Sequence, residues 1–139
     1  MTEEQKDLKD LLLKDLCARL PYGVKFACNK NVYTAKGLDL IVTDEGDWEY
    51  AVTAKGIAPI EIDFIKPYLF PFSSMTEEQR KEYDKIIYHS VELHCERYYD
   101  VIDVDSCDEL HDFYHKNHFD YRGLIPMDLA IDATGLIIY

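Results

Sequence analysis

The first twenty residues repeat apolar side chains at helical spacing. Leucines recur every three or four positions, at Leu8, Leu11, Leu12, Leu16 and Leu20. Other positions are charged and predict a solvent-exposed face on the opposite side of the helix. They are Lys6, Asp7, Lys9, Asp10, Lys14 and Asp15. Thr2 followed by Gln5 forms a capping box, and Pro21 with Gly23 ends the pattern. The pattern predicts an amphipathic helix between Thr2 and Pro21.

Residues 24–63 change to short segments rich in Val, Ile, Tyr and Thr, separated by turn residues. Five strands are predicted, near 24–28, 32–35, 38–42, 48–53 and 60–63. Residues 29–31 and 44–47 supply hairpin turns. Because the connections are too short for parallel crossovers, the strands should form an antiparallel meander.

Two prolines in residues 66–74 predict a packed, irregular connector, because proline lacks an amide donor and fixes φ. Thr76 and Gln79 then repeat the capping box and start a second long helix. One face of this helix is apolar, with Tyr83, Ile86, Ile87 and Val91. Residues 98–104 hold further β-forming side chains and predict one more short strand.

The stretch from 105 to 133 carries the densest polar chemistry. Ser106 and Glu109 form a capping box, so a helix is predicted over 107–117. Its apolar face consists of Leu110, Phe113 and Tyr114. An adjacent face carries His111, His115 and His118 at positions i, i+4 and i+7. The chain breaks at Gly123, and Pro126 predicts the first position of a last helix.

These elements predict an α+β fold in a single domain, residues 1–139. An antiparallel β-meander of four or five strands is packed by the N-terminal helix and the C-terminal helices.

Charge adds a functional constraint: 27 acidic against 15 basic residues give a net charge of -12. Such a chain should be repelled by nucleic acids and anionic membranes, and its acidic surface, rich in the eleven tyrosines, suits a basic partner protein.

The cysteines are scattered without a Cys-x-x-Cys pair, the N-terminus is charged and no apolar run reaches membrane-spanning length. A reducing cytoplasm is therefore expected.

No catalytic signature is assembled. A zinc site is one interpretation of His111, His115 and His118, with His94, Cys95 or Cys107 as a further ligand. The other is a polar, partly buried helix face with nothing bound, and Asn117 is a candidate helix end that would break the spacing.

Residues 119–123, Phe-Asp-Tyr-Arg-Gly, form the other candidate site. Asp120 can accept hydrogen bonds from the amides of the turn, and Arg122 can bind a carboxylate or phosphate through two parallel bonds. Two interpretations remain open. Either His118, Asp120, Tyr121 and Arg122 anchor a ligand or partner, or Arg122 pairs with an internal carboxylate and pins the last helix to the body.

Three sequence segments resemble those of a recurrent family of small proteins encoded by intestinal bacteria and by their phages and mobile elements. They are Leu-Cys-Ala-Arg-Leu-Pro-Tyr-Gly-Val-Lys at 16–25, Lys-Pro-Tyr-Leu-Phe-Pro-Phe-Ser-Ser-Met-Thr-Glu-Glu-Gln at 66–79 and His-Phe-Asp-Tyr-Arg-Gly-Leu-Ile-Pro-Met-Asp-Leu-Ala at 118–130. No activity is attached to this family, so the resemblance implies a bacterial intracellular accessory protein. The family pattern includes residues 118 and 120–123 but lacks His89, His94, His111 and His115.

Two classes of function follow. The first is a non-enzymatic protein-interaction module with an acidic, tyrosine-rich surface, one version of which blocks a host system by imitating nucleic acid. The second is a small-molecule or metal-binding protein, either a ligand sponge or a small enzyme, built on the histidine face and Arg122. A homodimer is compatible with either class.

Overall fold

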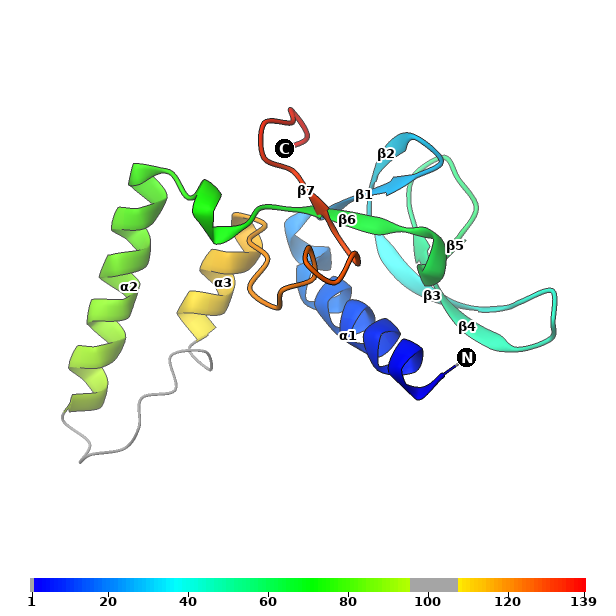
Figure 1. Ribbon diagram of the computed structural model, residues 1–139, viewed down its shortest axis with the longest axis horizontal. Helices are drawn as coiled ribbons and strands as arrows, with labels where there is room; N and C mark the ends of the chain where they lie inside the picture. The colour runs from blue at the N-terminus through cyan, green and yellow to red at the C-terminus, as the bar shows by residue number, and fades with distance from the viewer. Residues whose placement is uncertain (1, 96–107) are drawn as a thin grey trace.

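The computed structural model describes residues 2–95 and 108–139, and gives only the backbone for 89–95. Within these residues the fold is α+β, as predicted, with three α-helices and two sheets (Figure 1). Figure 1 shows the sheets at one end of the molecule, α2 at the other, and α1 and α3 between them. The predicted strand at 98–104, the Ser106 cap and Cys107 lie outside the described residues.

The capping boxes predicted from the sequence start the first two helices. Thr2 and Gln5 exchange both capping bonds ahead of α1 (Glu3–Arg19). The same pair of bonds joins Thr76 and Gln79 at the start of α2 (Glu77–Cys95). α1 ends in a 3-10 turn, Leu20–Tyr22, because Gly23 takes the left-handed conformation, φ 70°, that favours glycine. α3 spans Asp108–Lys116.

The strands divide between two sheets rather than forming one meander. One sheet has the order β2-β1-β6-β7, with β1 (Lys25–Cys28), β2 (Asn31–Thr34), β6 (Lys66–Leu69) and β7 (Ile131–Asp132). The other has the order β3-β4-β5, with β3 (Gly37–Val42), β4 (Trp48–Thr53) and β5 (Ile60–Glu61). Of the predicted pairings between sequence neighbours, β1–β2, β3–β4 and β4–β5 are formed and antiparallel, whereas β2 and β3 lie in different sheets. β6 and β7 are parallel.

The prediction of an irregular connector was wrong for residues 66–69, which form β6. Pro67 lies opposite Phe26 of β1, so proline is part of a paired strand. This is possible because β7 pairs only with Tyr68 and Leu69. Pro67 therefore pairs with β1 on one side and has no ladder partner on the other. At such an edge position no amide donor is needed, so proline is tolerated.

The last helix predicted from Pro126 is also absent, because turns fill the chain from Tyr121 to Ala130. The carboxylate of Asp120 accepts the amides of Leu124 and Ile125, which closes a turn before Pro126. Asp128 has a left-handed φ of 60°, which interrupts any helix, and β7 begins three residues later.

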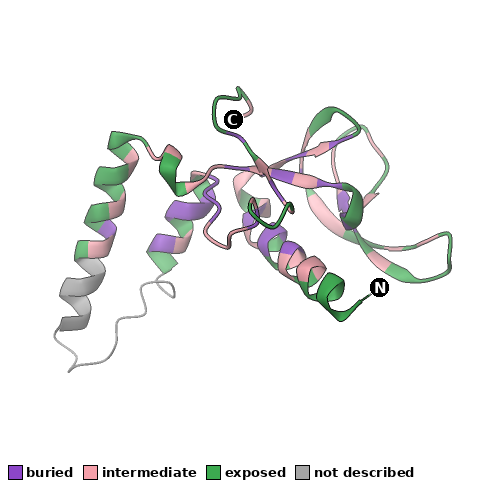
Figure 2. Cartoon of the chain, in the orientation of Figure 1, coloured by how far each residue is buried: buried purple, intermediate pink, exposed green. Residues whose placement is uncertain are grey.

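Apolar residues gather in two clusters. The larger packs α1 against both sheets, and the smaller joins α2, α3 and Phe119. The inner side of α1 is buried in Figure 2, and it includes Asp15 and Arg19, both 0% exposed. The prediction that Asp15 belongs to a solvent-exposed face was therefore wrong, and the reason is its pairing with two arginines.

Candidate functional site

The candidate residues 118–122 follow directly from the end of α3. The Asn117 side chain donates to the carbonyl of Phe113 at 2.9 Å, and His118 takes a left-handed φ of 59°. The helix thus ends before His118, as the sequence allowed. An isolated parallel bridge between Phe70 and Phe119 then fixes the segment beside the end of β6.

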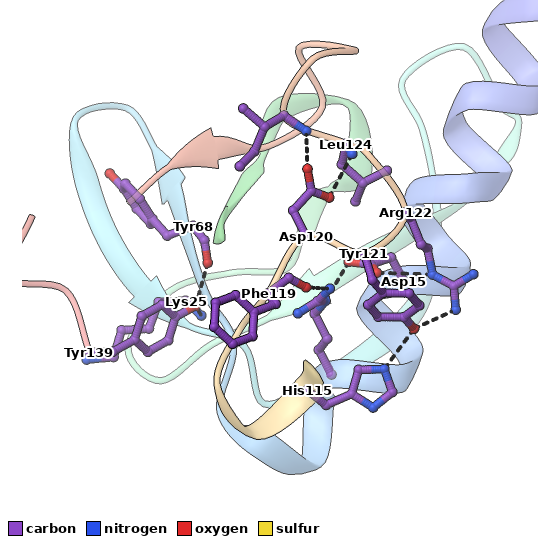
Figure 3. Close-up of polar contacts among 12 residues, drawn as sticks. Asp15, Lys25, Tyr68, His115, Phe119, Asp120, Tyr121, Arg122, Leu124 and Tyr139 are labelled. Atoms are coloured by element: carbon purple, nitrogen blue, oxygen red, sulfur yellow. Dashed lines mark hydrogen bonds and ion pairs between the residues drawn. The ribbon is translucent and has the colours of Figure 1, made fainter. Parts of the chain in front are cut away.

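Asp120 organises the turn that follows. It is 8% exposed, and its Oδ1 and Oδ2 accept the amides of Leu124 at 2.7 Å and Ile125 at 2.9 Å (Figure 3). This is the local role predicted from the sequence. Because both carboxylate oxygens are occupied by backbone amides, Asp120 holds the turn together.

Arg122 pairs with an internal carboxylate. Its Nε donates to Asp15 Oδ1 at 3.1 Å, while Arg19 Nε donates to Asp15 Oδ2 at 2.7 Å (Figure 3). Arg19 also donates through Nη2 to the carbonyl of Phe119. One buried carboxylate therefore joins α1 to the 118–122 segment, and the element pinned by Arg122 is this turn rather than a helix.

Tyr121 and His115 extend the same network. Arg122 Nη2 donates to the Tyr121 hydroxyl at 2.9 Å, and that hydroxyl lies 2.8 Å from His115 Nε2 (Figure 3). Because the hydroxyl accepts from Arg122, its proton is free to be donated to Nε2 of a neutral His115. Burial, reinforced by the positive charge of Arg19, lowers the pKa of His115 to about 4. Burial also raises the pKa of Tyr121.

His118 is separated from the other two histidines. Its ring stacks on Tyr139 with centroids 3.6 Å apart, whereas the His111 and His115 rings lie 6.2 Å apart on α3. Burial, with the charges of Arg19 and Lys25, lowers the pKa of His118 to about 4. Among the side chains that the structure describes, those of residues 2–88 and 108–139, no three His, Cys, Asp or Glu are grouped as a metal would require. The predicted three-histidine zinc set is not brought together.

A second candidate surface lies on the hairpin of β3 and β4, here called the arm (residues 37–54). Leu40 pairs with Tyr50 and Val42 with Trp48, so all four side chains share one face of the sheet. They are exposed by 48%, 45%, 54% and 68%, respectively. Figure 1 shows the β3–β4 turn extending beyond the rest of the sheet. We call these four residues the apolar stripe.

The arm is attached to α1 by Lys9. The Lys9 ammonium binds Asp63 at 2.9 Å and also pairs with Glu49 of β4. The Lys9 side chain is only 12% exposed, so it lies outside the solvent-exposed face predicted for it. Hydrogen bonds from Lys9 to the two carboxylates raise its pKa despite the opposing effect of burial. The ion pair with Glu49 therefore joins β4 to α1 between Trp48 and Tyr50, two residues of the apolar stripe.

Sequence reasoning placed the two strands but missed the surface. Leu38, Leu40 and Val42 stand at every second position of β3, which predicts that they share one apolar face. Such a face normally packs on a core, and this holds for Val52, which is 0% exposed. The sequence does not show that the core covers this face at Val52 but no longer covers it at Tyr50.

No family model, curated protein or solved structure matches this chain. The resemblance drawn from the three sequence segments therefore stays a prediction. Within the described part of the chain, none of the helices is both long and apolar enough to cross a membrane. The arm and the Asp15 network are therefore the two features from which function can be inferred.

Proposed function

We propose that the protein is a non-enzymatic interaction module that binds another protein through the arm. The observation that carries this proposal is the apolar stripe, four large side chains exposed on one face of a projecting hairpin. Aromatic residues flanked by a polar rim are typical of protein interfaces, and tryptophan and tyrosine dominate their binding energy.

Charge specifies the partner. Residues 37–54 contain no Lys or Arg, and their acidic side chains are Asp39, Asp44, Glu45, Asp47 and Glu49. Among the described ion pairs, only Glu49 of this set has a cationic partner. The partner should therefore present an apolar surface surrounded by basic residues, and the negative charge of the arm should repel nucleic acid.

The ligand-binding alternative is less well supported. Arg122 is paired with Asp15, His115 with Tyr121, and His118 stacks on Tyr139. Arg122 and His115 would have to exchange these partners to bind a metal or small molecule, and His118 is buried against Tyr139. The setting we propose, the cytoplasm of a bacterium or of a phage-infected cell, rests on the sequence resemblance and the scattered cysteines.

Affinity capture from a bacterial lysate with two matched variants tests the proposal. Trp48→Ser removes an aromatic side chain that is 68% exposed in the arm, and Tyr88→Ser removes one that is 70% exposed on α2. We expect Trp48→Ser to reduce recovery of a stoichiometric partner by about tenfold or more. Tyr88→Ser should leave recovery unchanged, and raising the salt concentration should weaken capture by the wild type.

Equal recovery of every captured protein by both variants would exclude the arm as the binding surface. Circular dichroism on each variant confirms that the fold is retained. Because both side chains are largely exposed, neither substitution should lower stability by more than about 0.5 kcal/mol.

A further inference from the structure

The outer edge of β3 is unpaired in the described part of the chain. β3 stands at the end of the sheet order β3-β4-β5, and its partner β4 lies on one side only. On the far side of β4, β5 pairs with Ala51 and Val52 but not with Tyr50. The tip of the arm is therefore a two-stranded ribbon with two free edges, each of which exposes backbone donors and acceptors.

Both free edges carry an outward amide capped by its neighbour. Leu40 and Tyr50 lie opposite each other in the register. The Leu40 amide donates to Asp39 Oδ1 at 2.9 Å, and the Tyr50 amide to Glu49 Oε1 at 3.0 Å. These amides thus point away from the β3–β4 ladder. A side-chain carboxylate occupies the place that the carbonyl of an added strand would take.

The two edges differ in what holds the capping carboxylate. Glu49 is also paired with Lys9, which ties it to α1 and closes that edge. Asp39 is exposed and takes part in none of the described ion pairs. Its carboxylate can rotate away at little cost, so β3 is the accessible edge.

We infer that the partner supplies an extended segment that pairs with the outer edge of β3, adding a fourth strand to this sheet. This inference rests on the proposed function of the arm. A carbonyl of the added strand accepts the Leu40 amide, and the released Asp39 carboxylate pairs with a Lys or Arg of that strand. Apolar side chains of the strand extend the apolar stripe. A second copy of the arm does not fit, because the arm is acidic and holds no Lys or Arg that could pair with the released Asp39 carboxylate.

Amide hydrogen exchange with a synthetic peptide of alternating lysine and valine tests this inference. At millimolar peptide, exchange of the Leu40 amide should slow by about tenfold, whereas the Tyr50 amide on the closed edge should be unchanged. The same peptide with N-methylated central amides is the control and should protect neither. Unchanged exchange at Leu40, or equal protection at Leu40 and Tyr50, would overturn the assignment of the β3 edge.

Two substitutions at one position separate the amide from the side chain. Leu40→Ala keeps the outward amide, and Leu40→Pro removes it at an edge position that tolerates proline. We expect the proline variant to bind the lysine–valine peptide about tenfold more weakly than the alanine variant. Asp39→Asn should weaken binding about two- to fivefold through the lost charge. Equal affinity of the alanine and proline variants would refute edge pairing.

These outcomes are separable from those of the proposed function. If partner capture depends on Trp48 but the β3 edge is not protected, the arm binds through its face alone. If capture does not depend on Trp48, the proposed function itself fails. The exchange measurement on the wild type needs no substitution and remains decisive even where Leu40→Pro fails to fold.

Discussion

Asp15 is the residue on which the internal network depends. It is 0% exposed and accepts hydrogen bonds from Arg19 and Arg122, which reach it from α1 and from the turn after α3. A buried carboxylate is tolerated only when it is paired and hydrogen-bonded, and both of its oxygens meet this condition. The network therefore links residues about one hundred positions apart in the sequence.

Replacing Asp15 by the isosteric asparagine should be strongly destabilising. The change leaves Arg19, also 0% exposed, without a counter-charge, and breaking a buried pair costs about 3–5 kcal/mol. Arg122→Ala should cost less, because the Arg122 side chain is 19% exposed. Urea unfolding of both variants measures the difference. A value for Asp15→Asn within about 0.5 kcal/mol of wild type would contradict the assigned role.

His118 should make stability depend on pH. Its pKa is about 4 in the folded protein against 6.5 in the unfolded chain, so the unfolded state binds more protons between these values. The contribution of neutral His118 to the free energy of unfolding is fully present above about pH 6.5 and is lost as the pH falls toward 4. Lowering the pH from 7 to 5 should therefore remove about 2 kcal/mol through this group.

His118→Asn is the matched variant, because asparagine accepts the left-handed backbone at φ 59° and does not titrate. The variant should lose less stability than wild type over the same pH interval, whatever its stability at pH 7. Urea unfolding at several pH values gives both slopes. Identical slopes for the two proteins would show that His118 is not held neutral by burial.

At the scale of the elements, local signals were predictable and long-range ones were not. The Thr2 and Thr76 capping boxes started the helices where the sequence predicted, because capping depends on residues three positions apart. β6 was missed because pairing across β1 and β7 decides whether Pro67 is tolerated. The candidate residue Arg122 was identified, but its partner Asp15 was not, because the helical pattern alone places Asp15 on the charged side.

Lys9 should control how firmly the arm is held to α1. Lys9→Gln leaves Glu49 and Asp63 without their shared cation, and the Lys9 side chain is 12% exposed. We expect a loss of about 1–2 kcal/mol and faster amide exchange in β4. Lys14→Gln, an exposed lysine of the same helix, is the control and should be neutral. Equal effects of the two variants would exclude a specific role for Lys9.

At the scale of the whole molecule, the buried network and the exposed arm are separate features. Arg19, Arg122, His115 and Tyr121 have partners within the chain, whereas the apolar stripe is left uncovered in the described structure. The net charge of -12 opposes self-association and favours a basic partner. The 118–122 segment therefore contributes to stability, and we propose the arm as the binding surface.

Fluorescence of Trp48 tests this account most directly, because it is the only tryptophan in the chain and lies in the apolar stripe with 68% of its surface exposed. The purified partner, added to the protein, should shift the emission of Trp48 to shorter wavelength and protect it from a soluble quencher. If the partner binds with full affinity while the emission and quenching of Trp48 stay unchanged, the arm is not the interaction surface.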